Sequence, residues 1–307
     1  MRITTITIDH GMCEAEGLCA SVCPTRIFTY KEKKVPAVSI ERECVLCGQC
    51  VAICPQDAIT HSVLEKARFG PVGDMPELDA RVVAASLRQR RSVRNYKKKP
   101  IPRAELEELA EIAGFSPTSA HGGEGWTRSC IIVSGEENMQ RVLDMTAEYL
   151  KMLANLLDSF VVRTVARVKP APRVGRSLLP DISMRLRRYE QGEDVITYNA
   201  PHAIFFHSPE HSVYPQVTCD TALYTVMLLA HAKGLGTCWN GWLMKAANGC
   251  KVKSLTKLRE FLGFPDHHQV YSAATLGYRA VKLHSTPDRR TAVRFIGEPT
   301  RSGSARL

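Results

Sequence analysis

The chain has 307 residues, 44% hydrophobic and 23% charged, which suits a globular protein with a large core and about two domains. No apolar run approaches the roughly 20 residues of a membrane-spanning helix, and no signal peptide is recognisable, so we expect a cytoplasmic protein with no membrane span. The formal net charge is +10. Residues 1–75 hold eight Lys or Arg against nine Asp or Glu, so the excess of positive charge comes from the residues after 75. No nucleic-acid-binding motif accompanies it, so we expect no nucleic-acid partner.

Two cysteine motifs near the N-terminus repeat each other at a constant offset of 31 residues. The first is CEAEGLCASVCP (Cys13–Pro24) and the second is CVLCGQCVAICP (Cys44–Pro55). The second has the C-x2-C-x2-C-x3-C-P spacing that binds iron–sulfur clusters in bacterial ferredoxins, a spacing that zinc sites rarely use. At one cysteine position the repeat fails, because Glu16 stands where the second motif has Cys47.

The spacing also assigns the ligands of two sites, because the fourth cysteine of each ferredoxin motif binds the cluster of the other motif. One [4Fe-4S] cluster is expected on Cys44, Cys47, Cys50 and Cys23. The other site has Cys13, Cys19 and Cys54, with Glu16 at its fourth corner. We expect this second site to be occupied. Three alternatives stay open: a [4Fe-4S] cluster with Glu16 as an oxygen ligand, a [3Fe-4S] cluster, or no cluster.

Residues 1 to about 65 resemble bacterial two-cluster ferredoxins, with strand-like segments RITTITID, RIFTY and AVSIE around the motifs. Such a domain relays single electrons, which implies a further redox centre in the rest of the chain. The segment RFGPVGDMPELD (Arg68–Asp79) holds two prolines and two glycines and is typical of a linker. We therefore expect a ferredoxin domain over residues 1–67, a linker over 68–77 and a second domain over 78–307.

The second domain begins with a helical pattern of apolar residues that runs into RRSVR (Arg90–Arg94), where arginines suit either a phosphate or the end of the helix. A helix over Arg103–Ala113 precedes a loop rich in glycine and serine and a strand over Cys130–Ser134. A basic helical segment covers about 145–198. The buried helix CDTALYTVMLLAHAKG then ends at Gly234, and LGTCWNGW follows as a strand or turn.

These elements, in this order, resemble the nitroreductase family of flavin-dependent enzymes over roughly residues 78–296. The matching segments are RRSVR (90–94), SPTSAHGGEGW (116–126), LLAHAKGLGTCWNG (228–241), FLGFPDHHQVYSAATLGY (261–278) and PDRR (287–290). The resemblance implies an α+β fold, with a ferredoxin-like iron–sulfur domain before a nitroreductase-type domain of mixed central sheet and flanking helices. It also implies a homodimer with FMN at the subunit interface.

The resemblance further assigns FMN contacts, and no catalytic side chain, because the flavin carries the chemistry. The phosphate and ribityl chain would be held by Arg90, Arg91, Ser92 and Arg94, and closed over by Arg289 or Arg290. The ring would meet Pro117, Thr118 and Ser119 of the partner subunit, with His121 nearest the family's loop asparagine. Trp239, Asn240 and Gly241 would pass its N5 edge, and the insertion at about 145–198 would cover the flavin.

The expected function is therefore an FMN-dependent oxidoreductase, in which iron–sulfur clusters pass electrons to FMN for two-electron reduction of a small organic acceptor. Nitroaromatic, quinone and enone-like compounds are the expected acceptors, and an external redox protein or NAD(P)H is the expected donor. Two alternatives stay open: a redox relay or sensor for a protein partner, and a flavin- or cofactor-remodelling enzyme. Cys238, close to the expected flavin, is interpreted as a small packed side chain.

Overall fold

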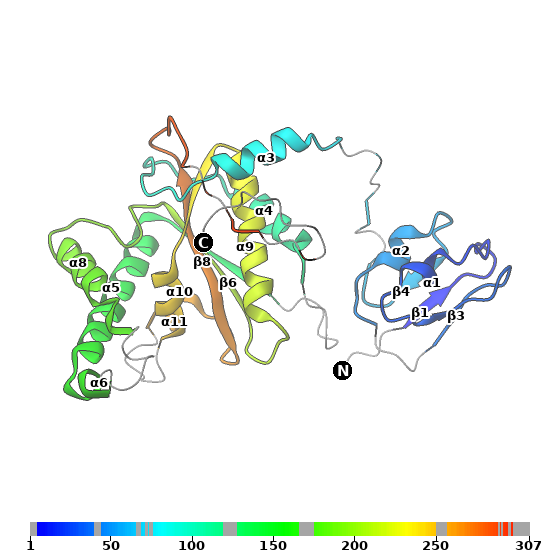
Figure 1. Ribbon diagram of the computed structural model, residues 1–307, viewed down its shortest axis with the longest axis horizontal. Helices are drawn as coiled ribbons and strands as arrows, with labels where there is room; N and C mark the ends of the chain where they lie inside the picture. The colour runs from blue at the N-terminus through cyan, green and yellow to red at the C-terminus, as the bar shows by residue number, and fades with distance from the viewer. Residues whose placement is uncertain are drawn as a thin grey trace.

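The computed structural model describes residues 5–39, 44–65, 69–70, 73, 76–118, 128–165, 175–249, 257–287, 289, 291–293 and 296. Figure 1 shows the elements up to β4 gathered in one small unit, and those from α3 onward in a larger one. Within the described residues, no helix is long and apolar enough to span a membrane.

The small unit interleaves the two halves of the sequence repeat. Strand β1 (Ile6–Ile8) pairs antiparallel with β4 (Ile59–His61), and β2 (Phe28–Thr29) pairs antiparallel with β3 (Ala37–Val38). Helices α1 (Leu18–Val22) and α2 (Gln49–Ile53) follow the first cysteines of the two motifs. The shared core consists of Ile6, Cys19, Ile27, Phe28, Cys50, Val51 and Ile59. Phe69, inside the expected linker, also packs against this core.

The larger unit is built on a sheet with the strand order β5-β6-β8-β7. Its strands are β5 (Ser129–Ser134), β6 (His202–Pro209), β8 (His268–Tyr278) and β7 (Leu235–Trp239), and all three pairings are antiparallel. A parallel bridge between Ser92 and Thr237 adds the segment after α3 to the sheet beyond β7 and makes the pairing mixed, as expected.

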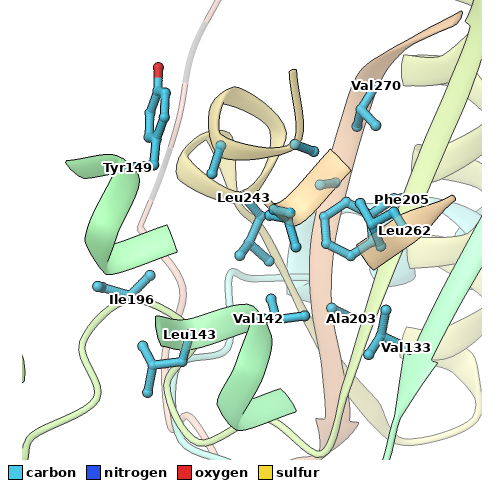
Figure 2. Close-up of a cluster of buried hydrophobic side chains, with 14 of the residues drawn as sticks. Val133, Val142, Leu143, Tyr149, Ile196, Ala203, Phe205, Leu243, Leu262 and Val270 are labelled. Atoms are coloured by element: carbon cyan, nitrogen blue, oxygen red, sulfur yellow. The ribbon is translucent and has the colours of Figure 1, made fainter. Parts of the chain in front are cut away.

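Helices cover both faces of this sheet, which explains why every residue of β6 is buried. On one face lie α5 (Glu136–Asp158), α8 (Leu179–Glu190), α10 (Gly241–Asn248) and α11 (Lys257–Leu262), with Phe205 and Ala203 in their core. Figure 2 shows this core, with Leu243, Val142 and Phe205 close together. On the other face lie α4 (Arg103–Ile112) and α9 (Pro215–Ala232), with Phe206 and Ile204 facing them. Helices α3 (Ala80–Gln89) and α6 (Phe160–Val165) complete the unit.

The buried ring of His202 ties β6 to the chain ahead of α4. The backbone N–H of Ile101 donates to His202 Nε2 at 2.8 Å, and His202 Nδ1 lies 2.8 Å from Ser134 Oγ. Because Nε2 accepts, the ring proton sits on Nδ1 and the imidazole is neutral. Burial lowers the pKa of His202 to about 4.

This depressed pKa predicts a loss of stability in acid. An unfolded histidine titrates near pH 6.5, so between pH 6.5 and 4 the unfolded chain binds more protons than the folded one. The contribution of His202 is therefore complete above pH 6.5, and on the order of 3 kcal/mol of unfolding free energy is lost by pH 4. Urea unfolding followed by tryptophan fluorescence should show a smaller acid loss in His202→Gln than in the parent. Equal losses in both would contradict this assignment.

The segment after α3 approaches β7 so closely that only glycine fits at position 236. A Cβ on Gly236 would lie 2.7 Å from Val93 Cγ1 and 2.8 Å from Arg279 Cγ. We expect Gly236→Ala to push Val93 off the strand and to cost about 1–3 kcal/mol of unfolding free energy. Gly114→Ala is the matched control, because a Cβ there meets no atom within 4 Å. Denaturant midpoints of the two variants should differ clearly, and matching midpoints would contradict the close approach.

Candidate functional site

The two cysteine motifs adopt the same backbone conformation. Each short helix starts after a glycine in the left-handed region, Gly17 with φ 74° and Gly48 with φ 72°. Two residues earlier, Ala15 (φ 57°) and Leu46 (φ 56°) are also left-handed, although residues with a Cβ rarely adopt this conformation. The 31-residue repeat is therefore a repeat of structure, and it presents its cysteines in equivalent ways.

The structure brings Cys23, from the first motif, to the three leading cysteines of the second. Burial, with smaller contributions from the nearby thiols of Cys44, Cys47 and Cys23, raises the pKa of the Cys50 thiol to about 11. Burial also raises the pKa of Cys44, with added contributions from Cys47 and Cys23. Four thiols thus form one group, as the ferredoxin spacing predicted. With their raised pKa, the thiols of Cys44 and Cys50 stay protonated until a metal displaces the proton.

The remaining cysteines form a second group around a small cavity. Burial raises the pKa of Cys19, and the thiols of Cys13 and Cys54 add to the effect. The cavity between them is lined by Cys13, Cys19 and Cys54, and also by the exposed residue Glu16. The structure therefore places Glu16 beside these three cysteines, at the repeat position where the other group has Cys47. Of the expected metal ligands, all eight fall into these two groups.

Both groups fit a cluster better than a single ion. Across the described ranges, no three His, Cys, Asp or Glu side chains converge so that one metal ion could be held. A tetrahedral zinc site needs its ligands around one atom, whereas each cysteine of an iron–sulfur cluster binds a different iron. Cysteines that lie in one group without surrounding a single point therefore match the iron–sulfur cluster that their sequence spacing predicts.

In the larger unit, the segment Arg90–Arg94 runs beside β7. The backbone N–H of Val93 donates to the Thr237 carbonyl at 2.9 Å. Among the described residues, Arg90 Nε and Nη1 are buried without a hydrogen-bond partner, while its guanidinium lies 5.8 Å from the centre of the Tyr224 ring. Buried guanidinium N–H groups are costly to leave unpaired. This arrangement fits an anion such as a phosphate.

The turn at Asn240 directly follows the end of β7, the strand beside which Arg90–Arg94 runs. Asn240 is buried, and its side-chain oxygen accepts from the N–H groups of Trp242 (3.1 Å) and Leu243 (3.2 Å) to cap α10. Its Nδ2 donates to the Ile196 carbonyl at 2.7 Å. The Asn240 side chain thus holds the turn, and the main chain of Trp239–Gly241 can face a ligand. The Trp239 side chain itself is 40% exposed.

Cys238 connects these two segments and is 2% exposed. Burial raises the pKa of its thiol, while Arg94 and the Ser92 hydroxyl lower it. A protonated, buried thiol fits the interpretation as a packed side chain. Its surroundings also show that Ser92 and Arg94 share one neighbourhood with Arg90.

The remaining expected flavin contacts lie elsewhere or outside the described residues. Pro117 and Thr118 are exposed, and the Pro117 carbonyl accepts from Thr221 Oγ1 on α9 at 3.1 Å. Arg289 is exposed near the C-terminus. Ser119, His121 and Arg290 lie outside the described residues. Within one chain, the structure therefore groups Arg90–Arg94 with Trp239–Gly241.

A loop beside this group was missed by sequence reasoning. Tyr198 (φ 61°) and Asn199 (φ 52°) are left-handed, and the Asp194 carboxylate fixes the loop by accepting from the N–H groups of Thr197 and Asn199, both at 2.7 Å. The Tyr198 ring lies 5.7 Å from the Arg94 guanidinium, and Arg185 of α8 donates to its hydroxyl at 3.3 Å. The segment DVITYNAP gives a turn signal, but nothing in it points to Arg94.

Comparison with known proteins decides the family of the larger unit. A family model described as "Nitroreductase family" matches residues 87–278, more than half of the chain. The chain belongs to the nitroreductase family. This nitroreductase-family oxidoreductase has the fold of an FMN-bound nitroreductase from Bacteroides fragilis (TM-score 0.51, 19% identity, 70% of this chain and 98% of that one). An FMN-dependent nitroreductase from Clostridium difficile gives TM-score 0.51 at 15% identity, over 71% of this chain and all of that one.

The N-terminal part of this nitroreductase-family protein is a ferredoxin domain. A model described as "4Fe-4S binding domain" matches residues 37–60. A ferredoxin of Methanothermococcus thermolithotrophicus is 38% identical over 58 residues, which are 18% of this chain and 95% of the ferredoxin. An uncharacterised ferredoxin of Methanocaldococcus jannaschii is 32% identical over 56 residues, 18% of this chain and 89% of that protein.

Proposed function

We propose that this chain is an FMN-dependent oxidoreductase in which iron–sulfur clusters supply electrons for the two-electron reduction of a small organic acceptor. The observation that carries the proposal is the union, in one chain, of two grouped cysteine sites of ferredoxin spacing with a nitroreductase-family domain. Cluster domains pass single electrons and need a partner centre. The domain that follows is of a family whose relatives in two solved structures are described with FMN.

The chain's own residues support FMN as that centre. In the described part of the chain, Arg90 Nε and Nη1 are buried without a hydrogen-bond partner and suit the phosphate, and Arg91, Ser92 and Arg94 follow on the same segment beside β7. Arg289 and Arg290 are proposed to close over the phosphate, and the main chain of Trp239–Gly241 to run beside the ring. Bound FMN would supply electron transfer to an acceptor stacked on its ring. The protein's part is to bind and orient the flavin and the acceptor.

We propose homodimerisation, with Pro117, Thr118, Ser119 and His121 reaching the flavin of the partner subunit. The support is an apolar stripe on and before α3 that the single chain leaves open to solvent. Leu78 is 87% exposed, Val82 65% and Leu87 44%. Large exposed apolar groups that recur on one helix face mark a surface that another protein covers.

The domain limits are proposed as residues 1–67, 68–77 and 78–307, with the C-terminal part of α5 and all of α6 and α8 in the insertion at about 145–198. Four exposed or half-buried arginines of α6 and α8 line this insertion: Arg163, Arg185, Arg187 and Arg188. Acceptors of the nitroaromatic, quinone or enone-like class fit a flavin site of this kind. The external donor is proposed to be a redox protein or NAD(P)H.

Anaerobic purification followed by a reductive titration tests the proposal. Iron and flavin are counted, and absorbance and EPR spectra are recorded at each step. We expect about seven or eight irons and one FMN per chain. A preparation that contains clusters but no flavin, even after incubation with FMN, would overturn the proposed function.

Glu16 is proposed to change the cluster held by Cys13, Cys19 and Cys54, either as a fourth ligand or by leaving three irons. We expect Glu16→Cys to give two ordinary [4Fe-4S] clusters, because it restores the complete motif of the second repeat. An EPR signal in the oxidised parent, absent from the variant, would identify [3Fe-4S]. Eight irons in the parent without that signal would identify an oxygen-ligated iron. Identical spectra and iron contents in parent and variant would sink the inference about Glu16.

A further inference from the structure

His61, the last residue of β4, is held against Cys44 of the second motif with one ring nitrogen free to donate. Its Nδ1 accepts the backbone N–H groups of Val63 and Leu64, both at 3.1 Å. A nitrogen that accepts two N–H groups carries no proton, so this pattern assigns the ring proton to Nε2. His61 Nε2 lies 3.6 Å from Cys44 Sγ, which is hydrogen-bond range for the large sulfur atom.

The ring has no freedom to leave this position. His61 is 6% exposed, so its ring is enclosed by the surrounding chain. The two backbone donors come from the turn that follows the strand, so ring orientation is set by the fold. Cys44 also accepts the backbone N–H of Leu46, with a distance of 3.4 Å to Sγ.

The repeat shows that this donor is particular to one site. The offset of 31 residues places Tyr30 where the second repeat has His61. Tyr30 points its hydroxyl at the Ala15 carbonyl, 2.9 Å away, and its ring covers Gly17. The first repeat therefore uses the position to fix the loop, whereas the second presents an N–H to a thiol.

We propose that His61 is a positioning residue that acts through Cys44: its Nε2–H donates to the Cys44 thiolate and raises the reduction potential of the cluster on Cys23, Cys44, Cys47 and Cys50. The added electron increases negative charge on the cluster sulfurs, and hydrogen bonds to those sulfurs stabilise the reduced form. The inference depends on the proposed role of Cys44 as a cluster ligand.

The test is a redox titration of the anaerobic holoprotein, followed by EPR at one fixed pH. His61→Phe keeps a ring but removes the donor, and we expect the ratio of reduced to oxidised cluster at a given potential to fall about tenfold. For a one-electron couple this corresponds to a midpoint lower by about 59 mV. His61→Gln retains an N–H and should recover part of the shift. Tyr30→Phe, the matched change in the first repeat, should leave this cluster's midpoint unchanged.

A second measurement needs no variant. In protein labelled with 15N-histidine, pulsed EPR of the reduced cluster should detect a coupling to one histidine nitrogen, transmitted through the hydrogen bond. Unchanged midpoints in His61→Phe with full iron content, or no histidine coupling in the parent, would overturn this inference and leave the proposed function standing. Iron counts on the same samples separate the two, because a chain without clusters overturns both.

Discussion

Cys23→Ala is expected to damage the cluster of the second motif, although Cys23 lies in the first. The structure groups Cys23 with Cys44, Cys47 and Cys50, because the Cys23 thiol contributes to the raised pKa of Cys44 and Cys50. The variant leaves three thiolates at this site, so one iron of the cluster loses its ligand. We expect the variant to lose about one to four irons per chain, all from this cluster. The Glu16-containing cluster should keep its distinct EPR spectrum.

The reciprocal variant, Cys54→Ala, is the sharpest comparison. Cys54 lies in the second motif but lines the cavity of Cys13, Cys19 and Glu16. Its loss should leave an ordinary [4Fe-4S] cluster as the only EPR signal of the reduced protein. Cys130→Ser, on β5 and far along the chain from both motifs, is the control and should keep full iron. If the two alanine variants each lose the cluster of their own motif, the crossed assignment is wrong.

Arg90→Met is expected to weaken FMN binding by about 10- to 100-fold. The magnitude follows from hydrogen bonds to charged groups, which contribute about 1.5–3 kcal/mol each. Methionine preserves the apolar stem that packs near Tyr224 but removes the N–H groups that are buried without a partner among the described residues. The FMN dissociation constant of the apoprotein, measured by flavin fluorescence, gives the effect directly.

Two further readings separate binding from folding in this variant. Arg88 is exposed in the last turn of α3, two residues before Arg90. The Arg88→Ala variant should bind FMN as the parent does. The Arg90→Met apoprotein should also be at least as stable as the parent apoprotein, because the two guanidinium nitrogens that lack a partner among the described residues are costly to bury. Unchanged FMN affinity in Arg90→Met would remove this residue from the phosphate site.

Where local pattern determines structure, the sequence alone predicted it well. The helix expected over Arg103–Ala113 is α4, which ends one residue earlier and continues as a short 3-10 turn. The expected strand Cys130–Ser134 is β5, and the helix that ends near Gly234 is α9. The grouping of the cysteines could also be predicted from their spacing. The two motifs have the same backbone conformation, so equivalent cysteines take equivalent positions.

Contacts between distant segments could not be predicted in the same way. The pairing of Ser92 with Thr237 depends on Gly236 leaving room for Val93, which only the packed sheet reveals. The role of His61 depends on two backbone donors from the following turn. In the sequence alone, His61 cannot be distinguished from an ordinary strand residue. For Ser119, His121 and Arg290 the expected flavin contacts remain predictions.

The central proposal is that the clusters pass their electrons to the flavin, which delivers them to the acceptor. It is tested by counting the electrons that the reduced protein delivers to an acceptor. Fully reduced, anaerobic holoprotein is mixed with a water-soluble benzoquinone in stopped flow, and cluster and flavin absorbance are followed together. About two quinones should be reduced per chain, since FMN holds two electrons and two clusters hold one each. Clusters and flavin should reoxidise together, and protein stripped of FMN should react far more slowly. One quinone per chain, with clusters still reduced, would contradict it.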